Sequence, residues 1–335
     1  MQTFLPYPDF RQSAAALDTP RLGKQRVEAL QTLRALVIPE YGWQSHPAIR
    51  MWMGHVPALT MYGLAMVDEW TKRGFDDTTR DNIREFAPQA AHPDYAAKIL
   101  LPPWLGDPEF HLSHRSNLIR KDPHFYEQVF PGTEHGLEYV WPEPRHEFLP
   151  EDPEGDVLWI LREHVGHGDP EKLDKVGLPA VGRAAQGSAV ASGGGAAGSG
   201  AGAGSGAGSG AGSGAAGDSD DDYQFVYAEE TSRRPAKVAR KAAPKPLVKK
   251  PSRKRQRQEA AFSTLPGKSP VAVPFDGGSR FAVGMVVGRP ITLDDGRFGR
   301  NFQLTDIIDR SEFDYPALLQ DPRVFFPVPA LGTRG

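Results

Sequence analysis

The 335-residue sequence contains no cysteine. This absence excludes a disulfide framework, a zinc or iron–sulfur site with cysteine ligands, and catalysis by a thiol. Long apolar runs are also missing, since none approaches the ~18 residues that a helix needs to cross a bilayer. The first residues, MQTFLPYPDF, lack the charged start and apolar stretch of a secretory signal. We therefore expect a soluble, intracellular protein with no membrane partner.

Glycine (36 residues) and proline (31 residues) are distributed unevenly and divide the chain. Residues 187–217 are almost wholly Gly, Ala and Ser, and such a tract cannot bury enough apolar surface to offset chain entropy. We expect the following parts: a helical domain at 1–150, a helical extension or linker at 151–186, the low-complexity linker at 187–217, a disordered acidic and then basic tract at 218–262, and a small β-rich module at 263–335.

Helical signals dominate residues 1–150. Asp18 or Thr19 can cap a helix with Pro20 in its first turn, and apolar residues then recur with the helical period as far as Val37. Similar patterns predict helices over residues 55–72 and 107–121, a short turn or helix from 122 to 126, and one more helix at Asp156–His164. No alternating strand pattern competes in this region. The N-terminal domain is therefore predicted to be all-α.

The last part of the chain has a different pattern. The segments FAVGMVVG and ITLDDGRFGRNFQLTDI alternate apolar and polar residues around Asp-Gly and Phe-Gly turns. Such alternation around short turns is typical of β-hairpins. We therefore expect the C-terminal module to be β-rich.

Four blocks of the N-terminal domain resemble the pyrimidine-dimer DNA glycosylase/AP lyase family, of which the phage endonuclease V type is the prototype. They are LDTPRLGKQRVEAL (Leu17–Leu30), YGWQSHPAIRMW (Tyr41–Trp52), MGHVPAL…DEWTKRGF (Met53–Phe75) and RKDPHFY (Arg120–Tyr126). The resemblance covers about residues 1–140. It implies an endonuclease V-like helical fold, and a DNA repair enzyme that acts on UV photoproducts or related base lesions in double-stranded DNA.

The resemblance also implies a mechanism. In the family the α-amino group attacks C1′ of the damaged nucleotide, a Schiff base forms, and β-elimination cuts the strand. Peptide α-amines have an ordinary pKa near 7.7–8.0, so part of the population is unprotonated and nucleophilic at neutral pH. Here the nucleophile would be the amine of Met1, because a residue as large as Gln2 usually leaves the initiator methionine in place. The family's essential glutamate corresponds to Glu28.

Several basic and polar side chains are candidates for contacts to DNA. They are Arg21, Lys24, Arg26, His46, Arg50, His55, Arg115, Arg120, Lys121 and Tyr126. Residues 1–145 carry 15 Lys and Arg against 18 Asp and Glu, so any basic patch is local. Where the phage pattern has Arg directly before the glutamate this chain has Val27, so the phosphate contacts should differ in detail.

Each assignment has a simpler alternative. Glu28 and Lys24 have the i, i+4 spacing of a surface ion pair on a helix. Tryptophans at helical spacing usually belong to a core, although Trp43 and three others could wedge into a duplex. The histidines lack nearby partners at metal-ligand spacing, so we expect neither a metal nor an organic cofactor.

The basic tract carries a second function. KKPSRKRQR (Lys249–Arg257) matches the pattern of a nuclear localisation signal, which predicts a nuclear import receptor as a partner and a nuclear location. The same charges would add salt-sensitive affinity for DNA. The alternative to an enzyme is therefore a non-catalytic nuclear DNA-binding or adaptor protein built on the same helical scaffold.

Overall fold

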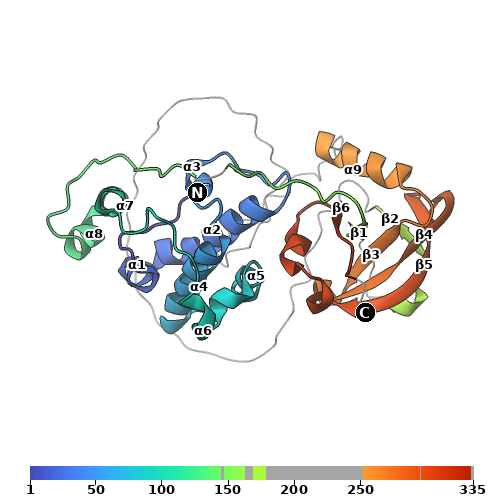
Figure 1. Ribbon diagram of the computed structural model, residues 1–335, viewed down its shortest axis with the longest axis horizontal. Helices are drawn as coiled ribbons and strands as arrows, with labels where there is room; N and C mark the ends of the chain where they lie inside the picture. The colour runs from blue at the N-terminus through green and yellow to red at the C-terminus, as the bar shows by residue number, and fades with distance from the viewer. Residues whose placement is uncertain (145–146, 163–168, 179–251, 295, 333–335) are drawn as a thin grey trace, which may run out of the picture.

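The computed structural model describes residues 1–144, 147–162, 169–178, 252–294 and 296–332. Figure 1 shows helices grouped in one part of the molecule and a sheet in the other, joined by the segment that leads from α8 to β1. The Gly/Ala/Ser linker predicted at 187–217 and the tract from 218 to 251 lie outside the described residues. No helix among the described residues is long and apolar enough to cross a membrane.

In the first part, every element assigned within residues 1–144 is a helix, as the sequence predicted. Its α-helices are α1 (Phe10–Ala16), α2 (Thr19–Val37), α3 (Pro47–Arg50), α4 (Val56–Lys72), α5 (Arg80–Arg84), α6 (Pro93–Ala96), α7 (Pro108–Lys121) and α8 (Pro123–Val129). Most of them have proline in the first turn, where its missing N–H has no helical partner to lose. The Asp18 side chain caps α2 by accepting a hydrogen bond from the N–H of Arg21.

Helices α2 and α4 form the centre of this part. A Cβ atom at Gly23 would lie 2.9 Å from the Trp70 ring, so the absence of a side chain lets α2 approach α4 closely. The buried faces of both helices meet in one core, with Leu22, Leu30 and Leu33 from α2 and Leu59 from α4. The apolar residues that recur with the helical period along α2 therefore face the core, as expected.

The second part is a mixed six-stranded sheet with the order β2-β5-β4-β3-β1-β6. Its strands are β1 (Val157–Leu161), β2 (Lys175–Gly177), β3 (Pro270–Phe275), β4 (Arg280–Thr292), β5 (Phe298–Asp309) and β6 (Phe325–Pro329). β1 and β3 are parallel, and the other pairs are antiparallel. The β-rich module predicted from the sequence is thus confirmed. Apolar clusters lie on both faces, and α9 (Arg253–Thr264) inserts Phe262 into one of them.

Two predicted features of the middle region differ from the structure. Asp156–His164 was expected to be helical, but Val157–Leu161 is strand β1, so the extension at 151–186 contributes strands. A run of five apolar residues fits a strand buried on both faces as well as a buried helix, and periodicity does not separate the two. β1 pairs with β3 and β6, which lie more than 100 residues away.

The boundaries predicted at 218–262 and 263–335 also differ from the structure. Residues 253–264 form α9 rather than a disordered tract, because no proline follows Pro251 until the helix has ended. Ser252 caps the helix by accepting from the N–H of Arg255, and Arg255 pairs with Glu259 one turn later at 3.1 Å. The module therefore consists of β1, β2, α9 and β3–β6.

The two parts are joined by polar contacts. Arg310 donates two hydrogen bonds to the Glu85 carboxylate, at 2.6 and 2.9 Å. Gln320 donates to the same carboxylate at 2.8 Å and accepts from Arg34 Nε of α2 at 3.0 Å. Glu85 follows α5, so the sheet module is attached to the helical part at α2 and the end of α5.

Candidate active site

The first five residues run through the interior of the helical part and place the N-terminus next to α2. Residues 2–5 are buried, and Figure 1 shows the N-terminus beside α3. The main-chain N–H of Gln2 donates to the Glu28 carboxylate at 3.3 Å. The structure therefore brings together Met1 and Glu28, the two residues predicted to be catalytic.

Gln25 holds this arrangement in place. Its side chain has no exposed surface, although the helical pattern put it on the polar face of α2. The amide nitrogen donates to the carbonyl of Gln2 at 3.0 Å and to the Glu28 carboxylate at 2.9 Å. The amide oxygen accepts from the N–H of Phe4 at 2.9 Å and from the Tyr62 hydroxyl. All four hydrogen-bonding positions of this buried amide are therefore used.

Further buried side chains fasten residues 3–6. The Trp52 indole N–H donates to the Thr3 hydroxyl at 3.0 Å. The N–H of Leu5 donates to His114 Nδ1 at 3.1 Å, and His111 Nδ1 lies 2.7 Å from the Leu5 carbonyl oxygen. Complete burial lowers the pKa of His114 to about 3, so the ring is neutral and accepts this hydrogen bond at physiological pH.

A polar and aromatic rim surrounds the N-terminus. The pKa of His46 is lowered, first by burial and then by the positive charge of the N-terminal amine, which therefore lies close to the ring. The Tyr139 hydroxyl is hydrogen-bonded to the Gln2 side chain, and burial is the main reason why its pKa is raised. Glu28 is the only acidic group among the charges that act on Lys121.

Basic side chains approach this site from α2 and from the end of α7. The pKa of Lys121 is lowered by burial and then by the charges of Arg120, Arg21 and Lys24, while Glu28 opposes this effect. Arg21 also donates to the Lys121 carbonyl at 2.9 Å. Three of the predicted DNA contacts, Arg21, Lys24 and Arg120, therefore act together with Glu28 on a fourth, Lys121. Neighbouring like charges of this kind fit the binding of an anion.

The structure places the other predicted DNA-contact residues elsewhere. Arg26 pairs with Asp77 and lies over the Trp70 ring, 4.3 Å from its centre. Arg50 pairs with Glu147 and lies 3.7 Å from a Glu143 carboxylate oxygen. These guanidinium groups have anionic partners within the chain, as does Arg21, which pairs with Asp18 at 2.5 Å and lies 3.6 Å from Asp122.

His55, Arg115 and Tyr126 are used in the fold. His55 is buried at the start of α4, and Arg115 donates to the Pro6 carbonyl at 2.8 Å. Tyr126 has no exposed surface, and its hydroxyl donates to the Asp18 carboxylate at 2.8 Å. The structure therefore assigns Tyr126 to the core and to the capping of α2 instead of a DNA contact.

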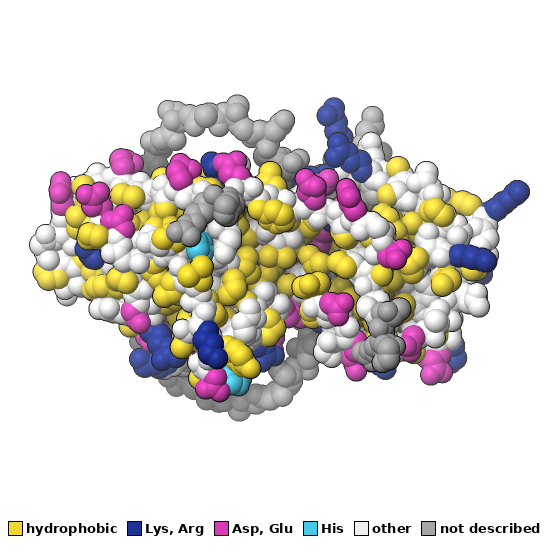
Figure 2. Space-filling view, viewed as in Figure 1, with side chains coloured by type: hydrophobic (Ala, Val, Ile, Leu, Met, Phe, Trp, Pro, Cys, Tyr) yellow, Lys and Arg dark blue, Asp and Glu magenta, His cyan; other side chains and the backbone are white. Residues whose placement is uncertain are grey.

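Charge is distributed unevenly over the surface. In the view of Figure 2, acidic side chains gather along the edge where the segment from α8 to β1 runs, while Lys and Arg side chains gather at the opposite edge of the helical part and over α9. This agrees with the slight acidic excess of residues 1–145.

The residues that position the N-terminus were not predicted from the sequence. Gln25, Tyr62, Tyr139 and His114 belong to four separate segments that meet only in the fold. The one local signal is the i, i+3 spacing of Gln25 and Glu28, which puts both on the same side of α2.

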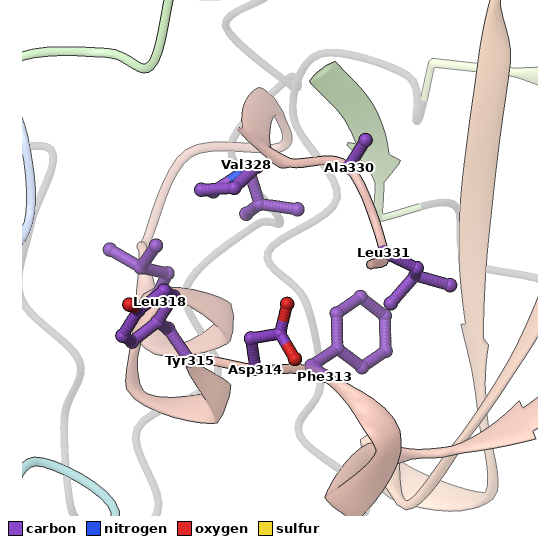
Figure 3. A pocket seen from close by; sticks show the side chains of 8 residues that line it. Phe313, Asp314, Tyr315, Leu318, Val328, Ala330 and Leu331 are labelled. Carbon is purple, nitrogen blue, oxygen red and sulfur yellow. The ribbon is translucent and has the colours of Figure 1, made fainter. Parts of the chain in front are cut away.

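A second hollow lies in the sheet module. Figure 3 shows the Asp314 carboxylate facing a space lined by Phe313, Tyr315, Leu318, Val328 and Leu331. The lining is apolar apart from this one carboxylate and the Tyr315 hydroxyl. Convergent polar groups, which usually mark a ligand site, are absent from the described lining of this hollow. Nor do the described residues contain a group of three or more His, Asp or Glu side chains arranged to hold a metal ion.

Comparison with known families gives a match to the N-terminal part. Residues 1–83 match the family model for pyrimidine dimer DNA glycosylase. The matched segment contains Met1, Gln25, Glu28 and His46, and it ends within α5. The family resemblance predicted for the N-terminal part is thus confirmed, and the sheet module lies outside the match. No curated protein and no solved structure matches the chain.

Proposed function

We propose that the helical part is a pyrimidine dimer DNA glycosylase with AP lyase activity, acting on UV photoproducts or related base lesions. The observation that carries this proposal is the hydrogen bond from the N–H of Gln2 to Glu28, because it puts the amine of the preceding residue, Met1, next to a carboxylate. The family match over residues 1–83 supports the glycosylase class. The lyase step is supported by the chemistry of a primary amine, the group that forms Schiff bases with sugars.

The proposed reaction uses one amine and one carboxylate. The unprotonated amine of Met1 attacks C1′ of the damaged nucleotide, so that a carbon–nitrogen bond forms while the bond from C1′ to the base breaks and the base leaves. Glu28 stabilises the positive charge that develops on the sugar. After the sugar ring has opened to the Schiff base, Glu28 removes a proton from C2′, and the bond from C3′ to the phosphate oxygen breaks.

DNA binding is assigned to the basic group around this site. Arg21, Lys24 and Arg120 act on the pKa of Lys121, as does Glu28, and each of these four cations would contact backbone phosphate without reading sequence. The lesion-containing strand would then lie across the end of α7 and the first turns of α2.

A nuclear location remains part of the proposal. Lys249–Pro251 of the predicted localisation signal lie outside the described residues, whereas Arg253 and Arg257 are exposed on α9 and accessible to an import receptor. The expected result is that a fluorescent fusion accumulates in the nucleus and becomes diffuse when Arg253 and Arg257 are both changed to Gln.

Borohydride trapping tests the enzymatic proposal. The full chain with an unmodified N-terminus is incubated with duplex DNA that carries a cyclobutane pyrimidine dimer or an abasic site, and the adduct is mapped by mass spectrometry. We expect a covalent adduct on Met1 with both substrates. The Glu28→Gln variant should cut dimer-containing DNA about 10²–10⁴-fold more slowly, the range typical for loss of a general acid–base group.

Glu127→Gln is the matched control, because Glu127 is an exposed glutamate on α8, away from Met1. It should cleave at the wild-type rate. An adduct with the abasic site alone would indicate a lyase with another lesion as its substrate. No adduct with either DNA, from protein whose amine is shown to be free, would favour the non-catalytic adaptor protein instead.

A further inference from the structure

The turn after α2 exposes a tryptophan in an unfavourable backbone conformation. Trp43 is 63% exposed, in contrast to the fully buried Trp52 of the same domain. Its φ angle is +71°, in the left-handed region that bulky side chains rarely adopt. Outliers of this kind persist only where the surrounding structure enforces them, and they often occur at functional sites.

The surrounding structure does enforce it. The Trp43 carbonyl accepts a hydrogen bond from the N–H of His46 at 2.9 Å. The side chain of the next residue, Gln44, donates to the carbonyls of Ala35 and Ile38 at the end of α2, each at 3.1 Å. The backbone of the turn is therefore fastened at Trp43 and Gln44, and the exposed indole lies beside the His46 ring.

A row of aromatic rings leads from Trp43 to the N-terminus. The ring centres of Trp43 and His46 are 5.9 Å apart, those of His46 and Trp141 6.1 Å, and those of Trp141 and Tyr139 5.1 Å. Tyr139 is hydrogen-bonded to Gln2. Trp43 is thus the solvent-exposed end of a row whose other end, Tyr139, is hydrogen-bonded to Gln2.

We propose that Trp43 enters the base stack of bound double-stranded DNA and stacks on a nucleobase next to the lesion. This inference rests on the proposed function and adds to it the residue that opens the duplex. An exposed indole offers a flat apolar face that any base can stack on. Because the backbone of the turn is fixed and the indole already lies beside the His46 ring, less conformational freedom is lost when the side chain enters the stack.

Two substrates separate duplex opening from chemistry. The first is duplex DNA with a pyrimidine dimer, and the second is single-stranded DNA with an abasic site, which needs no opening. We expect Trp43→Ala to slow trapping on the duplex roughly 5- to 100-fold, the effect of losing one base–aromatic stack, and to leave trapping on the single strand within about twofold of wild type. Trp43→Phe should restore most of the rate on the duplex. Tyr95→Ala, which removes an exposed aromatic ring elsewhere on the domain, is the control.

Two further measurements exclude a merely structural role. Trp43→Gly relieves the unfavourable φ angle, so it should raise the thermal midpoint while slowing duplex cleavage as much as Trp43→Ala does. A merely structural role predicts that Trp43→Gly would lower both the thermal midpoint and the rate of duplex cleavage. Placing 2-aminopurine beside the lesion reports unstacking, and its fluorescence should rise on binding of wild-type protein but not of Trp43→Ala.

The possible failures are distinguishable. If wild-type protein traps both substrates and Trp43→Ala cleaves the duplex at the wild-type rate, the inference about Trp43 is wrong and the proposed function stands. If wild-type protein traps neither substrate, the proposed function is wrong. In that case the rise in 2-aminopurine fluorescence on binding tests whether Trp43 enters the base stack. An equal rise with wild-type protein and with Trp43→Ala would overturn the inference.

Discussion

The helical part and the sheet module both bury polar groups, but they use them differently. In the helical part, the neutral side chains of Gln25, Tyr62 and His114 bind the main chain of residues 2–5. In the sheet module the buried polar groups include full charges: Arg323 pairs with Asp321, whereas Arg300 donates to the carbonyls of Leu265 and Gly288.

The paired charges of the module centre on Arg323. Its guanidinium group contacts Asp321 at 2.7 Å and Asp152 at 2.6 Å, and these carboxylates are the main factors that raise its pKa. Burial raises the pKa of Asp321, against the opposing effect of Arg323. Asp152 precedes β1 and Asp321 precedes β6, so the group fastens two distant segments to each other.

The two kinds of buried polar group hold different parts of the chain. In the helical part, neutral side chains hold residues 2–5 next to the Glu28 carboxylate. In the sheet module, the pairing of Arg323 with Asp321 and Asp152 connects segments that lie far apart in the chain.

The largest effect should follow from removing the central charge of the module. Arg323→Met leaves Asp321, which is 2% exposed, as an uncompensated buried charge, and should destabilise the module by about 3–5 kcal/mol. Asp152→Asn is the control, and it should cost less because Asp152 is 43% exposed. Hydrogen exchange on the full chain measures both effects. An equal loss of protection in α2 and α4 would contradict the separation of the two parts.

Gln25→Leu tests the positioning role of the amide in the helical part. The change keeps the shape of the side chain but leaves the N–H of Phe4 and the carbonyl of Gln2 without their partner. We expect Schiff-base trapping to slow by about 100-fold, a typical effect of misplacing a reactive group by about 1 Å. Gln89→Leu, at an exposed position, is the control. A wild-type trapping rate in Gln25→Leu would show that the hydrogen bonds of the Gln25 amide do not position the amine of Met1.

The smallest effect concerns pH. Because the pKa of His114 is about 3 in the folded protein, and near 6.5 once unfolded, the unfolded chain binds an extra proton between these values. The contribution of neutral His114 to the free energy of unfolding is therefore fully present above about pH 6.5. As the pH falls below this value, the free energy of unfolding decreases by up to about 1.4 kcal/mol for each pH unit.

In His114→Asn the side-chain oxygen can still accept from Leu5, but nothing titrates there. The free energy of unfolding of this variant should fall less steeply with decreasing pH, because unfolding takes up about one proton fewer than in the wild type. Denaturant unfolding between pH 7 and 4.5 measures the slope. Identical slopes in wild type and variant would show that His114 is protonated in the folded state.

Much of the fold was determined by local sequence. Asp18 and Pro20 start α2, proline begins α4, α7 and α8, and the alternating tail forms the β4–β5 pair, because caps, periods and turns act over a few residues. The family blocks within residues 1–83 also pointed to Met1 and Glu28 before any geometry was known.

Only the tertiary structure decided the rest. Val157–Leu161 form strand β1 because β3 and β6 supply hydrogen-bonding partners. Gln25 is buried because residues 2–5 pass over it and the main chain of Gln2 and Phe4 forms hydrogen bonds with its side chain. Likewise, the carbonyls at the end of α2 and the N–H of His46 hold Trp43 in its exposed position. These roles depend on contacts between segments far apart in the chain, and neither periodicity nor capping carries information about such contacts.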